Sequence, residues 1–465
     1  MLFCGEKRRI MYMKKKLLSV LLAGVMVISL AACGGGGGDS SGGDSNSNSS
    51  GSDTSAESDE GGSSEGGHKL TVWTWDPAFN IPAIKEAAEV YKAEVDSEFE
   101  LEVIETLSDD CETKLQTCAE SGDFGTMADI ILMQDNSFQK FVSFYPEAFT
   151  DLTDSGIDFS EFAEGKLAYS IVDGKNYGVP FDNGAAISCY RTDILDEAGY
   201  TIDDLTDIDW DKFIEIGKAV KEKTGKYMLS GQANSQDIIM MMLQSAGASL
   251  FNEDGTPNLV GNDALNECID LYQKMVKEGI FYEVNEWDEY VSSITNEQCA
   301  GTINGNWIMA TVMGMEDTSG NWAITNLPKL VKTEGATNYS NNGGSSWYIS
   351  SNCQNTDLAF DFMAKTFAGS VTLYENILPT TGAISTWGPA GDSEAYQAPQ
   401  EFWSDQPIFA TVVEFAEKTP SNNTSAYYYD VREVISTAIQ DIMSGAGEKD
   451  AILEQAQADA EFYYQ

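Results

Sequence analysis

The folded part of the chain alternates short apolar runs with longer amphipathic segments. Leu70 to Trp75 is rich in β-branched and aromatic residues, which predicts a strand. Leu101 to Ile104 predicts a second strand, and the run Asp129 to Met133 predicts a third that is covered on both faces. Between the first two, apolar residues at helical spacing predict a helix with its inner face at Ile84, Ala87, Ala88, Tyr91 and Val95. Strands that alternate with helices indicate an α/β lobe.

The second half of the chain repeats this alternation. Ala185 to Tyr190 predicts a strand. The helix that begins at Trp210 has Asp209 or Asp211 as its candidate N-cap. Gly279 is expected to end the following helix, Ala264 to Glu278. The helices expected here are Trp210 to Lys223, Ala264 to Glu278, Val431 to Met443 and Asp450 to Tyr463. Roughly 400 residues exceed what one core usually holds, so we expect an α/β fold with two lobes.

The N-terminus has the pattern of an export signal. Lys14 to Lys16 form a basic cluster, and the apolar run Leu17 to Ala32 is shorter than the ~20 residues that cross a bilayer. The run ends in Leu-Ala-Ala-Cys33, which resembles the bacterial lipobox, in which the cysteine is acylated and becomes the new N-terminus. We therefore expect a signal peptide at 1–32 and lipidation of Cys33, with an ordinary signal as the alternative. Translation could begin at Met1 or Met13.

Residues 34–68 contain almost only Gly, Ser, Asp, Asn and Glu. Such a segment cannot bury enough apolar surface to offset its ordering entropy, so it is expected to be a disordered tether. A flexible chain of this length spans about 30–35 Å root-mean-square. Cys33 and the tether, 33–68, would hold a folded domain clear of the lipid headgroups.

The net charge and the histidine content of the chain exclude several classes of function. The net charge is −47, which argues against nucleic acid and anionic lipid as partners. The one histidine, His68, lies in the expected tether, so histidine-based catalytic triads and histidine-ligated metals are excluded from the folded domain. There is no phosphate-binding loop or dinucleotide fingerprint, and no cofactor or metal is expected. A carboxylate pair remains available for glycoside chemistry.

Six cysteines follow Cys33, and their spacing matches no zinc pattern. On one helix Cys111 and Cys118 would stand ~10 Å apart along the axis, beyond disulfide reach. Disulfides and free buried thiols both remain open for Cys111, Cys118, Cys189, Cys268, Cys299 and Cys353.

Seven short motifs occur in an order that resembles the extracellular solute-binding proteins of ABC importers, in the carbohydrate-binding branch that includes maltose-binding protein. Each is weak alone, and their order behind a lipobox and a tether carries the resemblance. They are Leu70 to Trp75, Ala128 to Ile131, Tyr177 to Phe181, Trp210 to Phe213, Gln298 to Trp307, Gly343-Gly344, and Leu378 to Gly382.

The resemblance implies two α/β lobes that close on a ligand by a hinge motion, in a form that a membrane permease recognises. Matching the motifs places the crossings near Val179 to Asn183, Asn342 to Ser346 and Leu378 to Ile384. Lobe one would then be 69–180 plus 346–380, and lobe two would be 181–345 plus 383–465.

The resemblance also implies the ligand residues. A sugar needs flat aromatic faces against its C–H patches and polar side chains for its hydroxyls. Trp307 matches the sugar-stacking tryptophan of the family within a nearly identical motif, whereas Leu132 and Met133 stand where maltose-binding protein has a tryptophan, which puts maltodextrin in doubt. For Asp135, capping of the next helix is the alternative. The candidate ligand residues are Trp75, Asp76, Asp135, Asn136, Asp182, Asn183, Gln232, Asn234, Asn306, Trp307, Trp347 and Tyr428.

The expected function is capture of a sugar or oligosaccharide and its delivery to ABC permease subunits, by a monomer anchored through lipid to the outer face of the cytoplasmic membrane of a Gram-positive cell. One alternative keeps the fold but binds a peptide, a metal complex or a polyamine. A polyamine would suit the acidic groups of Asp76, Asp135 and Asp182. A second alternative is a carboxylate-pair glycosidase.

Overall fold

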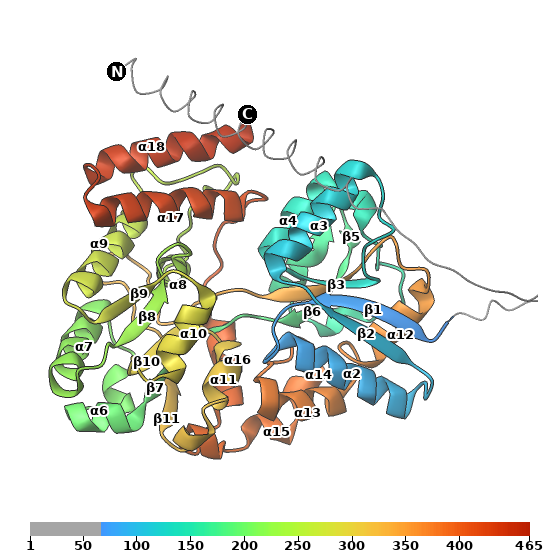
Figure 1. Cartoon of the computed structure of the whole chain (residues 1–465), viewed down its shortest axis with the longest axis horizontal. Helices are drawn as coiled ribbons and strands as arrows, with labels where there is room; N and C mark the ends of the chain where they lie inside the picture. The colour runs from blue at the N-terminus through green and yellow to red at the C-terminus, as the bar shows by residue number, and fades with distance from the viewer. Residues whose placement is uncertain (1–66) are drawn as a thin grey trace, which may run out of the picture. The chain divides into compact units, whose positions relative to one another are not determined.

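The computed structural model describes residues 67–465. The predicted signal peptide, Cys33 and nearly all of the tether lie outside these residues. Five strands form the first sheet, in the order β2-β1-β3-β12-β6 (Figure 1). Strand β1 is parallel to β2 and β3, whereas β12 is antiparallel to β3 and β6. Their bounds are β1 Lys69–Thr74, β2 Glu100–Glu105, β3 Ile130–Gln134, β6 Gly178–Asp182 and β12 Ser345–Ile349.

The predicted covering of β3 on both faces is confirmed, since Ile130 to Met133 are all buried. On one face Leu70 and Val72 pack in a cluster with residues of α2, α12 and α13. On the other face Trp73 and Ile131 pack with α3 and α4. We call these elements lobe one. Their bounds are α2 Asn80–Glu94, α3 Ser108–Ser121, α4 Asp135–Phe144, α5 Glu164–Leu167, α12 Thr356–Lys365, α13 Val371–Thr381 and α14 Gly388–Gly391, with the hairpin β4 Ile171–Val172 and β5 Lys175–Asn176.

Two smaller sheets organise the part that we call lobe two. One has the antiparallel order β10-β7-β11, and the other pairs β8 with β9 in parallel. The strands are β7 Ala186–Arg191, β8 Leu229–Gln232, β9 Phe281–Val284, β10 Gly301–Gly305 and β11 Trp322–Thr325. The helices are α6 Thr192–Ala198, α7 Trp210–Thr224, α8 Asp237–Ser245, α9 Asp263–Lys277, α10 Trp287–Thr295, α11 Ile308–Met313, α15 Glu394–Gln397, α16 Ile408–Lys418, α17 Tyr428–Ser444 and α18 Lys449–Glu461.

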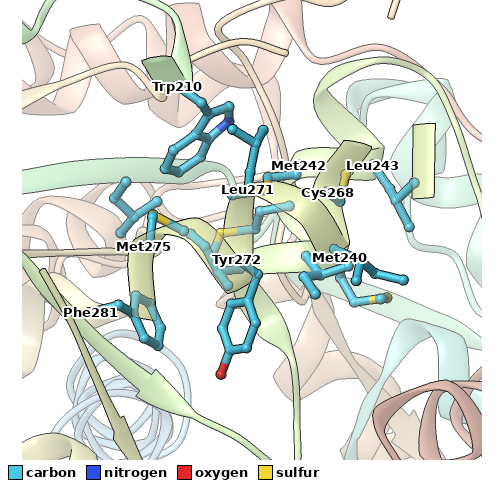
Figure 2. Close-up of a cluster of buried hydrophobic side chains, with 14 of the residues drawn as sticks. Trp210, Met240, Met242, Leu243, Cys268, Leu271, Tyr272, Met275 and Phe281 are labelled. Atoms are coloured by element: carbon cyan, nitrogen blue, oxygen red, sulfur yellow. The ribbon is translucent and has the colours of Figure 1, made fainter. Parts of the chain in front are cut away.

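The largest core of lobe two is rich in methionine. Trp210, Met240 and Tyr272 lie within it, together with side chains from α7, α8 and α9 (Figure 2). The predicted helices here are confirmed, and Asp209 is the N-cap of α7, since its Oδ1 accepts a hydrogen bond of 2.8 Å from the amide of Lys212. A second core of this lobe packs β7 and β11 against α16.

The chain passes between the lobes at three places. The first crossing runs from β6 in lobe one to β7 in lobe two. The second crossing returns to β12 in lobe one, and the third follows α13. Strand β6 continues to Asp182, and Ala383 and Ala390 pack in the lobe-one cluster, whereas Ile384 packs in lobe two. The lobe boundaries proposed from the sequence, which end the first segment of lobe one at 180 and begin the last segment of lobe two at 383, therefore differ from the structure by a few residues.

Within residues 67–465, every helix is too short or too polar to cross a bilayer.

Candidate functional site

The indole of Trp307 lies where the two lobes meet. This half-buried residue follows β10 and packs against hydrophobic clusters of both lobes. Its Nε1–H donates a hydrogen bond of 2.9 Å to the carbonyl oxygen of Asn342, on the second crossing. A Cβ at Gly305 would overlap the indole nitrogen, so only glycine lets the ring lie against this backbone. The polar edge of Trp307 is therefore satisfied within the protein, and what it can offer a ligand is an apolar face.

A buried hydrogen-bond network holds this arrangement. The Asn342 side chain donates to Asn304 Oδ1 at 2.6 Å, and Asn304 donates to the hydroxyl of Tyr290 at 3.0 Å. The Tyr290 hydroxyl also bonds Thr302 at 2.5 Å. These residues connect α10, β10 and the second crossing. These residues were not predicted to belong to the site, because nothing local in the chain shows that Asn304 and Asn342 meet.

Asp135 and Asp182 lie together in a buried charged cluster at the first two crossings. Lys166 Nζ forms an ion pair with Asp135 and donates to the carbonyl oxygen of Ser345 at 2.9 Å. Asp135 also accepts from Ser346 at 2.9 Å, and Asp182 accepts from the Ser345 amide at 3.0 Å. The side chains of Asp135 and Lys166 are 4% and 5% exposed.

Burial dominates the electrostatics of this cluster. It raises the pKa of Asp182 to about 6, and the charge of Lys166 partly opposes that rise. Burial also raises the pKa of Asp135, again against the effect of Lys166. The structure thus gives both carboxylates partners within the crossings. The capping alternative for Asp135 is wrong, because Gln134 is the N-cap of α4 and the carboxylate of Asp135, the first residue of the helix, bonds Lys166 and Ser346 instead. Sequence reasoning missed Lys166, whose partners lie 31 and 179 positions away.

Two of the predicted ligand residues are corrected. Trp347 is fully buried, and its ring lies between Phe181 and Phe367 at centroid distances of 5.3 and 5.4 Å. It alternates inward along β12, so it belongs to the lobe-one core. Asn306 is also fully buried, and its amide donates to the carbonyl oxygen of Gly382 at 3.3 Å. Neither side chain has surface to offer a ligand in this arrangement.

Trp75 and Asp76 lie in the turn between β1 and α2. The buried Asn80 side chain accepts hydrogen bonds from both of their amides, at 3.1 and 2.8 Å. Asp76 Oδ1 itself accepts from the amides of Ala78 and Phe79, and burial raises the pKa of Asp76. Asp76 therefore organises the turn, and half-buried Trp75 packs against the lobe-one core.

The predicted loop residues of lobe two lie between β8 and α8. Half-buried Gln232 ends β8, and Asn234 is exposed. Arg432 of α17 holds this loop, since its guanidinium donates to the carbonyl oxygen of Ser235 at 3.0 Å and forms an ion pair with Asp237. Tyr428, half-buried, lies one turn before Arg432 on the same helix. A cavity of about 20 Å³, which is room for roughly one water, is lined by polar residues such as Gln232 and Asn304 and by apolar residues such as Leu229 and Ile303.

Contacts between α4 and the start of α17 connect the lobes away from the crossings. Lys140 and Asp430 form an ion pair of 2.6 Å, and the Tyr429 hydroxyl donates to Gln134. Asn136, predicted to bind ligand, accepts from Thr424 at 3.1 Å. Of the other predicted residues, Asn183 is half-buried on the first crossing, where its carbonyl oxygen accepts from Asn341.

The described residues hold no cluster of three or more metal-ligating side chains. All six cysteines within them are free and buried, which decides the question that the sequence left open.

Comparisons with known proteins give the family of this chain and two of its relatives. Residues 86–410 match the model of the family described as bacterial extracellular solute-binding protein. A lactose-binding protein of Rhizobium radiobacter is 37% identical over 378 residues, covering 81% of this chain and 89% of the relative. An arabinooligosaccharide-binding protein of Halalkalibacterium halodurans is 26% identical and covers 60% of this chain and 63% of the relative.

Solved structures show the same fold. The GacH receptor of Streptomyces glaucescens superposes with a TM-score of 0.71 at 16% identity, over 85% of this chain and 97% of that one. An ABC transporter associated binding protein from B. animalis subsp. lactis, solved with β-1,6-galactobiose, gives 0.72 at 18% identity over the same shares. This chain belongs to the bacterial extracellular solute-binding protein family, and it has the two-lobed α/β fold of its structural neighbours.

Proposed function

We propose that this protein captures a sugar or short oligosaccharide outside the cell and delivers it to an ABC-type permease. The observation that carries the proposal is Trp307, which is half-buried where the lobes meet. Its N–H is bonded to Asn342, so its ring is held in one orientation and presents an apolar face. Such a face suits the C–H patches of a pyranose. The lactose-binding relative, at 37% identity, supports a sugar as the ligand.

Thermal unfolding with a sugar panel tests the proposal. A ligand that binds only the folded protein stabilises it by RT ln(1 + [L]/Kd), which is about 2.7 kcal/mol at one hundred times the Kd. We expect lactose or a related sugar to raise the melting temperature in a concentration-dependent way. Trp307→Ala should abolish the shift, whereas Phe462→Ala should retain it, since this 72% exposed ring lies in the C-terminal turn after α18. No shift with any sugar would contradict the proposal.

The alternative ligands find less support. A polyamine would need free carboxylates, but Asp135 is paired with Lys166, Asp182 accepts from Ser345, and Asp76 accepts from two backbone amides.

We infer that the protein is a binder and not a glycosidase, because the family to which it belongs is one of solute-binding proteins. Recovery of intact labelled oligosaccharide after incubation would support this, and turnover would contradict it.

We also propose that Cys33 is lipidated and anchors a monomer to the outer face of the cytoplasmic membrane of a Gram-positive cell. The extracellular family supports a location outside the cytoplasm. Leu-Ala-Ala-Cys33 after a short apolar run supports the anchor. Two acyl chains suffice for stable attachment. Cys33→Ser should release the protein into the medium, and mass spectrometry of the wild-type N-terminal peptide should show the acyl mass. Release of the wild type at the same rate would argue against the anchor.

A further inference from the structure

Lys166 is a buried lysine whose amine lies against a buried carboxylate. Its Nζ forms an ion pair with Asp135, and the two side chains are 5% and 4% exposed. Among the other ion pairs that lysines form within residues 67–465, the lysine side chain is at least 28% exposed. Lysine is rarely buried this deeply, because taking its charge out of water is costly. The contact between Lys166 and Asp135 therefore differs from the surface ion pairs of the chain.

The neighbouring groups hold this pair in one geometry. Lys166 Nζ also donates to the carbonyl oxygen of Ser345 at 2.9 Å, and the Ser346 hydroxyl donates to Asp135 Oδ1 at 2.9 Å. The amine itself donates to the other oxygen of Asp135, Oδ2. The backbone is fixed as well, since the Asp135 amide donates to the carbonyl oxygen of Gly344 at 3.0 Å. Each carboxyl oxygen of Asp135 thus has its own donor.

A second buried carboxyl group, that of Asp182, lies beside the pair. It accepts from the amide of Ser345 at 3.0 Å and from the hydroxyl of the same residue, whose carbonyl oxygen holds Lys166. Burial raises the pKa of Asp182 to about 6, so this group can take up and release a proton near neutral pH. Burial also raises the pKa of Asp135, which favours its protonated form.

Two physical effects favour an amide bond over an ion pair at this position. An amide is neutral, so its formation removes the cost of keeping two charges away from water. Groups that are held in contact also react as if each were present at roughly 10⁵–10⁸ M, because the entropy of bringing them together is already lost on folding. A lysine amine, a carboxyl group and a second acid are together sufficient for this condensation.

We propose that Lys166 Nζ and Asp135 Cγ become joined by an intramolecular amide bond, with Asp182 as the group that transfers the proton. The bond joins the start of α4 to α5 within lobe one. It gives this lobe a covalent cross-link, whereas the six cysteines of the described residues are all free. The cross-link is independent of sugar binding and goes beyond the proposed function.

The reaction is a condensation that releases one water. Within the ion pair, a proton passes from Lys166 Nζ to Asp135 Oδ2, which gives a neutral amine and a carboxylic acid. The lone pair of Nζ then attacks Asp135 Cγ, and the Ser346 hydroxyl stabilises the charge that develops on Oδ1. Asp182 takes a proton from the nitrogen and passes it to Oδ2, the bond between Cγ and Oδ2 breaks, and water leaves. No oxidant, reductant or further reactant is needed.

Peptide mass mapping of the purified full chain tests the cross-link. Trypsin cuts after lysine, so an unlinked chain gives the peptides 115–140, 141–166 and 167–175. The cross-linked chain should instead give one branched peptide, in which 115–140 is joined to 141–175 and the mass is lower by one water. Cleavage after Lys166 should be absent, because its side chain is no longer a free amine.

Lys166→Arg is the variant that should lack the bond. Its guanidinium stays charged, so it can pair with Asp135 but cannot attack it. After the substitution itself is allowed for, the intact wild type should be lighter than this variant by one water. Lys175→Arg is the matched control and should retain the loss of water, since Lys175 pairs with Asp151 in the same lobe and its side chain is 56% exposed.

Asp182→Asn tests the proton transfer separately. The new side chain keeps the size of the carboxyl group but cannot exchange a proton near neutral pH. In samples taken soon after synthesis, the cross-linked fraction should fall about tenfold or more. Near-ultraviolet circular dichroism that matches the wild type would show that the variant is folded. Equal cross-linking in the folded variant and the wild type would overturn the role of Asp182.

The masses decide the cross-link whether or not a variant folds. An unlinked peptide 141–166 as the main product of the wild type would overturn it. A loss of water that persists in Lys166→Arg would also overturn it, because this result would indicate cyclisation of an aspartate in place of a bond to lysine. Sugar binding is tested by the thermal shifts and stands or falls independently of these masses.

Discussion

At the scale of single residues, the buried Lys166, Asp135 and Asp182 cluster shows how polar groups at the crossings are stabilised. Lys166 pairs with Asp135, and the serines of the second crossing donate hydrogen bonds to Asp135 and Asp182. Leaving a buried charge without a partner typically costs 3–5 kcal/mol, so such a cluster persists only when it is satisfied. These residues were expected to contact ligand directly. Their burial instead points to control of the geometry of the crossings.

Asp182→Asn should change how stability depends on pH. The folded-state pKa of Asp182 is about 6, against an ordinary value of 3.8, so the folded protein binds this proton more tightly than the unfolded chain. Stability from this group is therefore present at low pH and lost as pH rises from about 4 through 6. Relative to Asp182→Asn, the wild type should lose on the order of 1–3 kcal/mol across this window. Urea denaturation at several pH values measures the difference, and parallel pH curves for the two proteins would refute the assignment.

At the scale of elements, the second crossing depends on two glycines in a row. Gly343 and Gly344 have φ of +104° and +106°, in a region that other residues rarely adopt. A Cβ at Gly344 would lie 2.6 Å from Asp135 Oδ2, directly against the buried cluster. Because these glycines have no side chain, the second crossing approaches Asp135 closely, and the start of β12 therefore lies beside the Asp135 carboxylate.

Gly344→Ala should destabilise the protein by at least about 1–3 kcal/mol, because it combines backbone strain with a steric clash. Gly391→Ala is the matched control, since nothing lies within 4 Å of its added methyl and its φ is not positive. The control should leave the urea midpoint unchanged or raise it slightly. Equal midpoints for the two variants would contradict the role given to Gly344.

Element positions were largely predictable from the chain alone, whereas site geometry was not. The run at Asp129 to Met133 identifies β3 because it is apolar throughout, and the period of apolar residues identifies α7 and α9. The partner of Asp135 was not predictable, because Lys166 reaches it from a short helix and Ser346 from 211 positions away. Trp347 was misread for a related reason. A strand residue can face the core or the cleft, and the register of the sheet decides which.

At the scale of the whole molecule, the described residues are stabilised by separate hydrophobic cores, with no disulfide among them. Lobe one has clusters on both faces of its sheet, and lobe two has a methionine-rich core and a second one beside α16. The six cysteines of the described residues are buried and free. Burial raises the pKa of the Cys111 thiol to about 12 and that of Cys299 to about 11. At neutral pH the thiols of Cys111 and Cys299 are protonated and shielded.

These six thiols should not react while the protein is folded. Iodoacetamide at pH 8, followed by peptide mass mapping, should label them only after unfolding in guanidinium, because all six are buried and out of reach of the reagent in the folded protein. The melting temperature should be the same with and without a reductant. Labelling of the folded protein, or a lower melting temperature in reductant, would contradict the free and buried state.

The amino-acid sequence by itself determined the α/β class, the places of most strands and helices, the family and the candidate role of Trp307. These follow from local periodicity and from short motifs, which the chain carries wherever it folds. Only the tertiary structure decided which polar residues are buried, that Lys166 pairs with Asp135, and that Trp287 lies against Trp307. The reason is that burial and pairing depend on segments far apart in the chain, which meet only when the sheets and the crossings are in place.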